Sequence, residues 1–134
     1  MRYRHVGVRS NIVMSLAGSE PRWQMTRTMV VLSEPGWRPD TDVYETATSI
    51  VIVADLAGVG DDDFEILLFE DALVIEGQRT VPPVDARAIY RVAAIRQGPF
   101  RIAIGLPGPV NPDNVSARYD AGLLRVTLGR MAAG

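Results

Sequence analysis

The stretch Ala117-Arg118-Tyr119-Asp120-Ala121-Gly122-Leu123-Leu124-Arg125-Val126-Thr127-Leu128 decides the fold of this chain. Apolar and polar residues alternate from Val115 to Tyr119 and again from Leu124 to Leu128. Alternation with a period of two predicts two strands, each with one buried face. Between them, Ala121-Gly122 supplies the small residue and the positive φ angle that a tight reversal needs. The stretch therefore predicts a β-hairpin.

Further strands are predicted on both sides of this hairpin, and no segment has the pattern of a long helix. β-branched and aromatic residues in short runs, separated by Gly, Pro and Asp, are typical of strands joined by turns. Many short strands at close spacing indicate an all-β sandwich of the immunoglobulin-like type. The predicted strands cover residues 43–45, 49–55, 64–70, 72–79 and 100–106, with a possible short strand at 89–92.

Four segments resemble, in order and near the expected spacing, the signature of the α-crystallin domain of small heat shock proteins. The hairpin carries Ala-x-x-x-x-Gly-Leu-Leu, which resembles the family's A-x-x-x-n-G-V-L motif. Asp55–Val59 resembles D-L-P-G-V, with Ala57 in place of proline. Ala72–Arg79 resembles x-L-x-I-x-G-E-R, with Gln78 in the glutamate position, and Gly98–Pro107 resembles G-x-F-x(5)-L-P.

The resemblance implies an α-crystallin-type β-sandwich over residues 40–130. It is preceded by an N-terminal arm, residues 1–39, that we expect to be largely irregular or partly helical, and it is followed by a short tail, residues 131–134. The implied function is that of an ATP-independent chaperone, a holdase that binds partly unfolded proteins and suppresses their aggregation. Two alternatives stay open: a co-chaperone or assembly adaptor on a related sandwich that binds one protein partner, and a small ligand-binding sandwich.

Composition narrows the classes of site. The 134 residues suffice for one domain with a real core. The chain has no cysteine, which excludes disulfides, thiolate metal sites and a cysteine nucleophile. No stretch approaches the roughly 18 apolar residues of a membrane span, and no secretory signal is evident at the N-terminus. We therefore expect a cytoplasmic protein without a membrane partner.

Charge is distributed unevenly along the chain. Residues 1–39 carry six arginines and two glutamates, a net charge of +4, whereas the remainder carries eight arginines and fourteen acids, a net charge of −6. A basic arm on an acidic body is a possible anion-binding surface. The arginines are scattered, however, and form no continuous basic run, so we expect no nucleic-acid partner.

No catalytic constellation is evident, and we expect neither an enzyme nor a cofactor. His5 is the only histidine and has no serine or carboxylate at a motif spacing. Asp61, Asp62 and Asp63 are consecutive in a turn, where side chains diverge, whereas a hard cation needs carboxylates that converge. This run is interpreted as a solvated turn.

The arm holds the candidate client-binding residues Met14, Trp23, Met25 and Met29. Methionine repacks at little cost, so a surface rich in methionine and tryptophan suits partners of irregular shape. The alternative is a terminal arm without a binding role. Both interpretations are kept.

A hydrophobic groove is the second candidate site. Alternation places Phe64, Ile66 and Leu68 on the core face, yet Leu67 and Phe69 on the opposite face are apolar too. Either a loop or the arm covers them, or they line a groove for an apolar peptide. In the resembled family such a slot lies between the edge strands, which assigns it here to Ile66, Leu67, Leu68, Phe69, Val115 and Ala117.

The connection between Arg79 and Gly98 is long for a hairpin and contains two consecutive prolines. We call residues 80–97 the excursion. In bacterial and plant members of the resembled family, this segment pairs with the first strand of a second subunit. The resemblance thus implies a homodimer formed by strand exchange, with an interface of Val43, Tyr44, Ile89, Tyr90, Arg91 and Val92.

Assembly size is predicted from the C-terminal residues. The resembled family builds large shells with a C-terminal apolar tripeptide, and residues 129–134 contain no such motif. We therefore expect dimers or small oligomers in which the arm fills the groove, with Ile12–Met14 or Met29–Leu32 as the inserting stretch.

Overall fold

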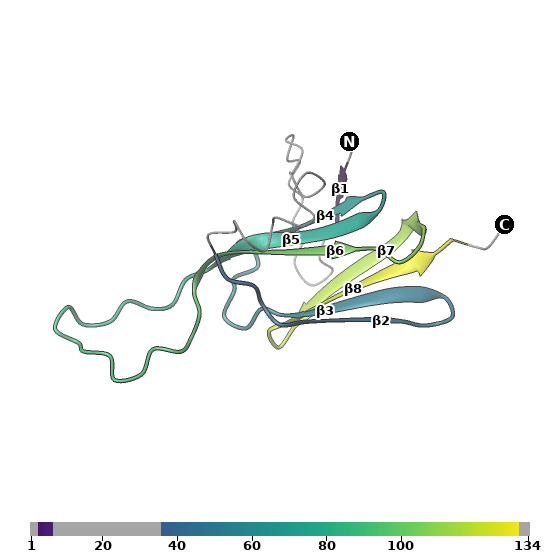
Figure 1. Cartoon of the computed structure of the whole chain (residues 1–134). Coiled ribbons are helices and arrows are strands. Elements are labelled where there is room, and N and C mark those ends of the chain that lie inside the picture. The colour runs from purple at the N-terminus through teal and green to yellow at the C-terminus, as the bar shows by residue number, and fades with distance from the viewer. Residues whose placement is uncertain (1–2, 7–35, 132–134) are drawn as a thin grey trace.

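The computed structural model describes residues 3–6 and 36–131, which form eight strands in two antiparallel sheets (Figure 1). No helix occurs among these described residues, in agreement with the predicted all-β fold. The strands are β1 (Tyr3–His5), β2 (Thr41–Glu45), β3 (Ser49–Asp55), β4 (Phe64–Phe69), β5 (Ala72–Arg79), β6 (Gly98–Gly105), β7 (Val110–Asp120) and β8 (Leu123–Arg130).

The two sheets stack as the layers of a sandwich (Figure 1). One has the strand order β1-β4-β5-β6 and the other the order β2-β3-β8-β7. β4 and β5 form a hairpin, and so do β7 and β8. The β3-β8 pair, by contrast, joins strands that lie far apart in the sequence. β7 has a register shift between Val110 and Val115, and beyond it the pairing with β8 is continuous.

Alternate residues of each strand fill the space between the sheets. On β4 these are Phe64, Ile66 and Leu68, the face predicted from the sequence. Full burial of one such side chain contributes about 1.5–3 kcal/mol, and no charged residue is buried in the described part of the chain. The other members of this core cluster larger than alanine are Val6, Ile50, Ile52, Leu56, Val59, Leu73, Ile75, Phe100, Ile102, Ile104, Leu124, Val126 and Leu128.

The predicted hairpin is formed by β7 and β8. Both turn residues have positive φ angles, 53° for Ala121 and 81° for Gly122, as a two-residue reversal between twisted strands requires. The turn is held from outside as well, because the Leu56 amide donates a hydrogen bond of 2.8 Å to the Gly122 carbonyl. The connection that follows β3 is thereby fixed to the hairpin tip.

Tyr119 ties the same connection to β7. Its hydroxyl oxygen lies 2.7 Å from the carbonyl oxygens of both Leu56 and Val59, so one proton serves two acceptors. Its ring meets Phe64 edge to face, with centroids 5.2 Å apart. Burial, and secondarily the carboxylates of Asp61 and Asp55, raise the pKa of the Tyr119 phenol.

The excursion projects from the sandwich as a long loop (Figure 1). β5 ends at Arg79, as the prolines predicted, and no strand is assigned between Arg79 and Gly98. The possible strand at residues 89–92 is therefore absent in the single chain. The physical reason is that the segment extends away from both sheets, so that its backbone has no neighbour within the chain to pair with.

Strand β1 is the feature that sequence patterns missed. The arm was expected to be irregular or partly helical, but Tyr3–His5 pairs with β4 in an antiparallel register, Tyr3 opposite Phe69 and His5 opposite Leu67. Val6 follows in the core cluster and is 7% exposed. A three-residue strand is too short to show a period, which explains why the sequence did not reveal it.

We predict that Tyr119→Phe lowers the free energy of unfolding by about 1–2 kcal/mol, because two buried acceptors lose their donor while the aromatic packing is kept. Urea unfolding followed by circular dichroism measures the change. The control is Ser116→Ala, which removes an exposed hydroxyl from the same strand and should leave stability unchanged. Equal stability of the Tyr119 and Ser116 variants would contradict the role assigned to the hydroxyl.

Candidate functional site

The excursion carries an unusual set of exposed apolar side chains. Ile89, Val92 and Ile95 are 76%, 80% and 75% exposed, and Val84 and Tyr90 are also exposed. Large aliphatic side chains are normally withdrawn from water, and a cluster of them marks an interaction surface. Of the residues predicted at the dimer interface, Ile89, Tyr90, Arg91 and Val92 thus lie together on this loop.

The other predicted interface residues lie on β2, an edge strand. β2 pairs with β3 on one side, and among the described residues no strand pairs with its other side. Val43 and Tyr44 are about half exposed on this strand. An edge with free backbone groups and apolar side chains is suited to accept another strand. Within one chain, however, the structure does not bring β2 and the tip of the excursion together (Figure 1).

The β2 edge and the excursion carry opposite charges. β2 carries Asp42 and Glu45, whereas the excursion carries three arginines and Asp85, a net charge of +2. Glu45 already forms an ion pair with Arg130 at 3.1 Å, which leaves Asp42 as the acid on β2 that has no ion pair at this distance with a described residue. Opposite charges steer association and fix its register more than they add affinity.

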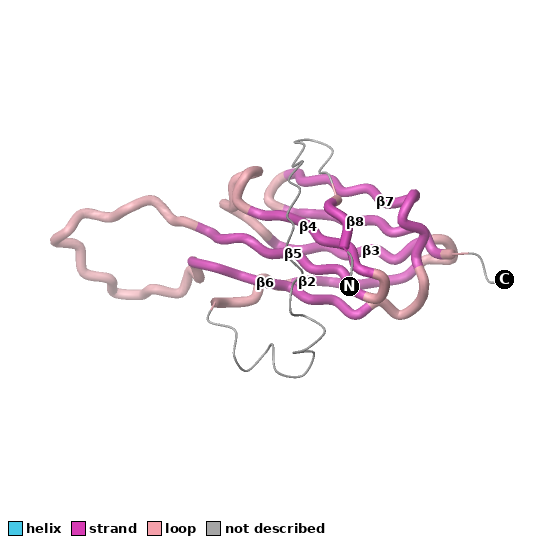
Figure 2. The backbone as a smooth tube through the Cα atoms, turned by 90° about the horizontal axis from the view of Figure 1, so that it is seen from above, coloured by secondary structure: helices cyan, strands magenta, loops and turns pink. Residues whose placement is uncertain are grey.

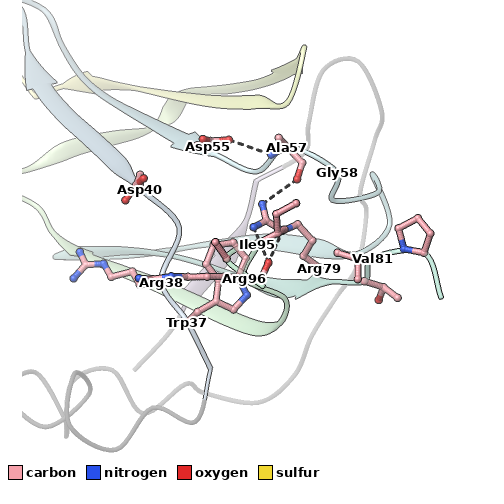
Figure 3. A pocket seen from close by; sticks show the side chains of 13 residues that line it. Trp37, Arg38, Asp40, Asp55, Ala57, Gly58, Arg79, Val81, Ile95 and Arg96 are labelled. Carbon is pink, nitrogen blue, oxygen red and sulfur yellow. Dashed lines mark hydrogen bonds between the residues drawn. The ribbon is translucent and has the colours of Figure 1, made fainter. Parts of the chain in front are cut away.

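Arg79 holds the base of the excursion in place (Figure 3). Its guanidinium donates to the Arg96 carbonyl from Nε at 2.9 Å and from Nη2 at 2.7 Å, and to the Ala57 carbonyl from Nη1 at 3.1 Å. Its guanidinium carbon also lies 4.2 Å from the ring centroid of Trp37. One side chain thereby joins both ends of the excursion to the sandwich and to the end of the arm.

A hollow of about 870 Å³ opens beside this contact. Trp37, Ile95 and the stem of Arg79 give it an apolar side, and Asp40 and Asp55 give it an acidic side (Figure 3). It lies where the excursion leaves the sandwich, next to the beginning of β2.

The predicted groove residues lie on β4 of one sheet and on β7 of the other, and those on β4 divide between the two faces of their sheet. Ile66, Leu68 and Ala117 are buried in the core cluster, with Val115 packed against it. The edge of β4 beside them is occupied by β1, and the Val6 amide donates a 3.0 Å hydrogen bond to the Ile66 carbonyl. Residues 3–6 therefore fill this position. The stretches predicted to insert, Ile12–Met14 and Met29–Leu32, lie outside the described residues.

Leu67 and Phe69 belong to a separate buried set on the opposite side of the sheet. With Ala72, Val74 and the partly buried Ala103 they form what we call the outer-face cluster. All four fully buried members are at most 2% exposed. The prediction that Leu67 and Phe69 face away from the core is confirmed, and these two residues do not share a slot with Ile66 and Leu68.

A row of charged side chains adjoins this cluster on the same face. Glu65, Glu76 and Arg101 are register partners on β4, β5 and β6. Burial raises the pKa of the Glu76 carboxyl, Arg101 opposes this shift, and Glu65 adds to it. Arg101 Nε lies 3.7 Å from the Glu76 carboxylate, a loose ion pair. The row is thus partly withdrawn from water.

The four candidate client-binding residues of the arm lie outside the described residues: Met14, Trp23, Met25 and Met29. Within the described ranges no group of three or more His, Asp or Glu side chains is arranged to hold a metal ion. Nor does that part of the chain contain a helix long and apolar enough to cross a membrane.

Comparison with known proteins decides the family. Residues 42–133 match the Hsp20/alpha crystallin family, in the region that forms β2 to β8. The chain belongs to this family. The resemblance carried by the hairpin and the three other segments is therefore confirmed, and so is the fold of an α-crystallin-type sandwich.

Two relatives illustrate the match in sequence. The chain is 28% identical to small heat shock protein C2 of Rickettsia felis over 96 residues, which are 72% of this chain and 62% of that protein. It is 32% identical to a probable 15 kDa heat shock protein of Leptospira interrogans over 90 residues, 67% of this chain and 68% of the relative. The aligned part thus spans about two thirds of each relative's length.

Two solved structures illustrate the match in shape. Heat shock protein 16.0 from Schizosaccharomyces pombe superposes with a TM-score of 0.65 at 26% identity, covering 71% of this chain and 88% of that one. A small heat-shock protein from Xylella fastidiosa gives the same TM-score and identity over 74% of this chain and 91% of its own. Both agree with the two-sheet arrangement described above.

We predict that Arg79→Met loosens the base of the excursion, because the stem stays over Trp37 while three hydrogen bonds are lost. A loss of about 0.7–1.4 kcal/mol in local opening free energy corresponds to a three- to tenfold faster cleavage by trypsin after Arg96. Mass spectrometry of the fragments measures that rate. Arg87→Met, which changes an exposed arginine near the tip, is the control. An unchanged rate in the Arg79 variant would contradict this prediction.

Proposed function

We propose that this protein is an ATP-independent holdase that binds partly unfolded proteins and suppresses their aggregation. Unfolding proteins expose apolar surface and strand edges, and this chain offers matching features. The proposal is supported above all by membership of the Hsp20/alpha crystallin family, whose members are chaperones rather than enzymes. It includes a cytoplasmic location and the absence of a nucleotide or other cofactor.

The client-binding surface in this proposal is the arm. Met14, Trp23, Met25 and Met29 give it four large, adaptable apolar side chains in a segment of otherwise mixed polarity. A surface of this kind covers exposed apolar segments of many shapes with modest affinity for each. Reversible cover without directed unfolding needs no chemical energy source, which is why no catalytic site is required.

The working unit in this proposal is a homodimer formed by strand exchange. The excursion of each chain would pair with the free edge of β2 in the other chain, burying Ile89 and Val92 against Val43 and Tyr44. The support is the combination of exposed apolar residues, an open strand edge and opposite charge on the two surfaces. Pairing would also supply the backbone hydrogen bonds that the excursion lacks within one chain.

We predict that replacing both Ile89 and Val92 by Asn weakens dimerisation at least a hundredfold, about 2.8 kcal/mol, because two buried aliphatic side chains would each contribute about 1.5–3 kcal/mol. Sedimentation equilibrium measures the dissociation constant. Deletion of residues 84–91 should give monomers whose circular dichroism spectrum retains the sandwich.

Leu123→Asn is the matched control for this experiment, since Leu123 is a half-exposed leucine at the hairpin tip, outside both proposed surfaces. It should leave the dissociation constant unchanged. Dimers that persist both in the double variant and in the deletion variant would show that the excursion is not the interface.

The holdase proposal is tested by light scattering of a heat-aggregating enzyme with and without this protein. We predict that replacing Met14, Trp23, Met25 and Met29 together by Ser removes most of the suppression while dimerisation stays intact. Substitution is preferable to removal of residues 1–36, because removal would also take Val6 from the core and β1 from the edge of β4.

The control for the arm is the triple variant Arg9→Gln, Arg22→Gln, Arg27→Gln, which removes charge and keeps every apolar side chain. It should suppress aggregation as the unaltered protein does. Full suppression by the serine variant would exclude the arm as the client-binding surface, and loss of suppression in the glutamine variant alone would indicate that charge is what binds.

A further inference from the structure

Few hydrogen bonds join the excursion to the sandwich. The loop leaves the ends of β5 and β6 and extends beyond the strands (Figure 2). Within the described part of the chain, the hydrogen bonds that join residues 80–97 to the rest of the protein are the two from Arg79 to the Arg96 carbonyl. Two others, which end on Asp85, lie inside the loop itself. The direction in which the excursion leaves the sandwich therefore depends on its base.

Trp37, near the end of the arm, is seated where β6 begins. Its ring Nε1 donates to the Gly98 carbonyl at 3.2 Å, and its amide donates to the Pro99 carbonyl at 3.2 Å. The ring meets Phe100 edge to face, with centroids 5.7 Å apart. Gly36 lies so close to the Pro99 carbonyl that a Cβ atom there would collide with it. Trp37 is thus fixed to the residues at which the excursion ends.

One guanidinium joins Trp37 to the excursion, and it uses different directions for the two contacts (Figure 3). The planar fork of Arg79 donates from its edge to the Arg96 carbonyl, while its face lies over the Trp37 ring. Hydrogen bonds at the edge of a guanidinium and stacking on its face do not compete. Both contacts need the same long side chain to be ordered, so each lowers the entropic cost of the other. The two contacts therefore favour each other.

The third acceptor, the Ala57 carbonyl, gives the guanidinium a fixed point on the sandwich. The Ala57 amide donates to Asp55 Oδ1 at 3.2 Å. Its neighbour Leu56 donates to the Gly122 carbonyl and accepts from the Tyr119 hydroxyl. Because this connection is held to the hairpin, the parts of the contact that can open are the excursion and the end of the arm.

We propose that Trp37 is a positioning residue for the excursion: seated on β6, it orients the Arg79 guanidinium, which sets the direction in which the excursion meets a second chain. The effect is reciprocal, because a coupling free energy between two contacts acts equally on both. An excursion held by a second chain keeps Trp37 seated, and release of Trp37 loosens the excursion. This inference deepens the proposed function and rests on it in one respect, the use of the excursion as the dimer interface.

A double-mutant cycle tests the coupling without a second chain. All proteins carry Ile89→Asn and Val92→Asn, and trypsin is limited so that each molecule is cut at most once. Trp37→Leu and Arg79→Met should each raise the rate of cleavage after Arg96 about three- to tenfold, and their combination should add no more than about twofold to the larger single effect. Independent contacts would multiply to roughly ten- to hundredfold, and that result would overturn the proposal.

Cleavage after Arg125 separates opening of the base from loss of the fold. Arg125 lies within β8, so its rate of cleavage reports unfolding of the sandwich and should stay unchanged. Trp37→Phe is the second variant, because a phenyl ring keeps the contact with Phe100 but attracts a cation less than indole does. It should raise cleavage after Arg96 alone. A rise that occurs only together with cleavage after Arg125 would show a merely structural role and contradict the proposal.

The reverse direction is measured on Trp37 itself, in the same background. Trp23→Phe leaves Trp37 as the single tryptophan of the chain, and acrylamide quenching of its fluorescence reports its exposure. Changing residues 94–96 to glycine loosens the end of the excursion and should raise the quenching constant about twofold. The matched control changes residues 85–87, near the tip, to glycine and should leave the constant unchanged. Equal quenching constants in these two variants would refute the reciprocal effect and with it the proposal.

Dimerisation provides the functional readout. With the excursion otherwise unaltered, Trp37→Phe should raise the dissociation constant of the dimer about two- to fivefold, because each dimer uses two excursions and a loosened one is less competent to bind. Sedimentation equilibrium measures the constant, and Leu123→Asn is again the control. An unchanged constant in the Trp37 variant would overturn the positioning role. If the unaltered protein is a monomer, the proposed interface fails, whereas cleavage after Arg96 still decides whether Trp37 and the base are coupled.

Discussion

Unpaired backbone at the edges of the two sheets is the constraint on which the rest of this structure depends. A sandwich has open edges whose N–H and C=O groups need partners, and an open edge attracts other chains. Here β4 is paired by β1, and the edge of β6 receives a bridge from Trp37. The free edge of β2 remains open among the described strands. The chain thus pairs edge strands of one sheet with its own N-terminal residues, whereas the β2 edge of the other sheet has no partner among the described strands.

Apolar side chains outside the core follow the same division. Ile89 and Val92 are exposed to water on the excursion, which pairs with no strand of the described chain. On the outer face of the β1-β4-β5-β6 sheet, Leu67 and Phe69 are as buried as core residues. The two sets therefore differ in one respect: the first is accessible to a partner, whereas the second is not. Arg79 connects the excursion to the end of the arm, because it contacts both the base of the excursion and Trp37.

Edge pairing also explains how four N-terminal residues occupy the edge of β4. The stretches expected to insert, Ile12–Met14 and Met29–Leu32, lie outside the described residues, and their insertion stays a prediction. Strand addition depends mainly on backbone hydrogen bonds, and one branched side chain is enough to enter the core. Tyr3–Val6 meets that requirement with a single apolar anchor, Val6. A long apolar run is therefore not needed where the backbone supplies most of the contact.

By itself the sequence determined most of the strands after residue 40, the hairpin at Ala121-Gly122, the core face of β4 and the family, because each depends on local alternation, on turn chemistry or on motifs read residue by residue. Only the tertiary structure decided that Tyr3–His5 is a strand, that residues 89–92 are not one within a single chain, and that Leu67 and Phe69 lie on a buried outer face. Each of these depends on which backbone or side chain lies across from the residue in space. Local sequence carries no information about a neighbour that is sixty residues away, so pairing partners and burial become known only when the sheets are assembled.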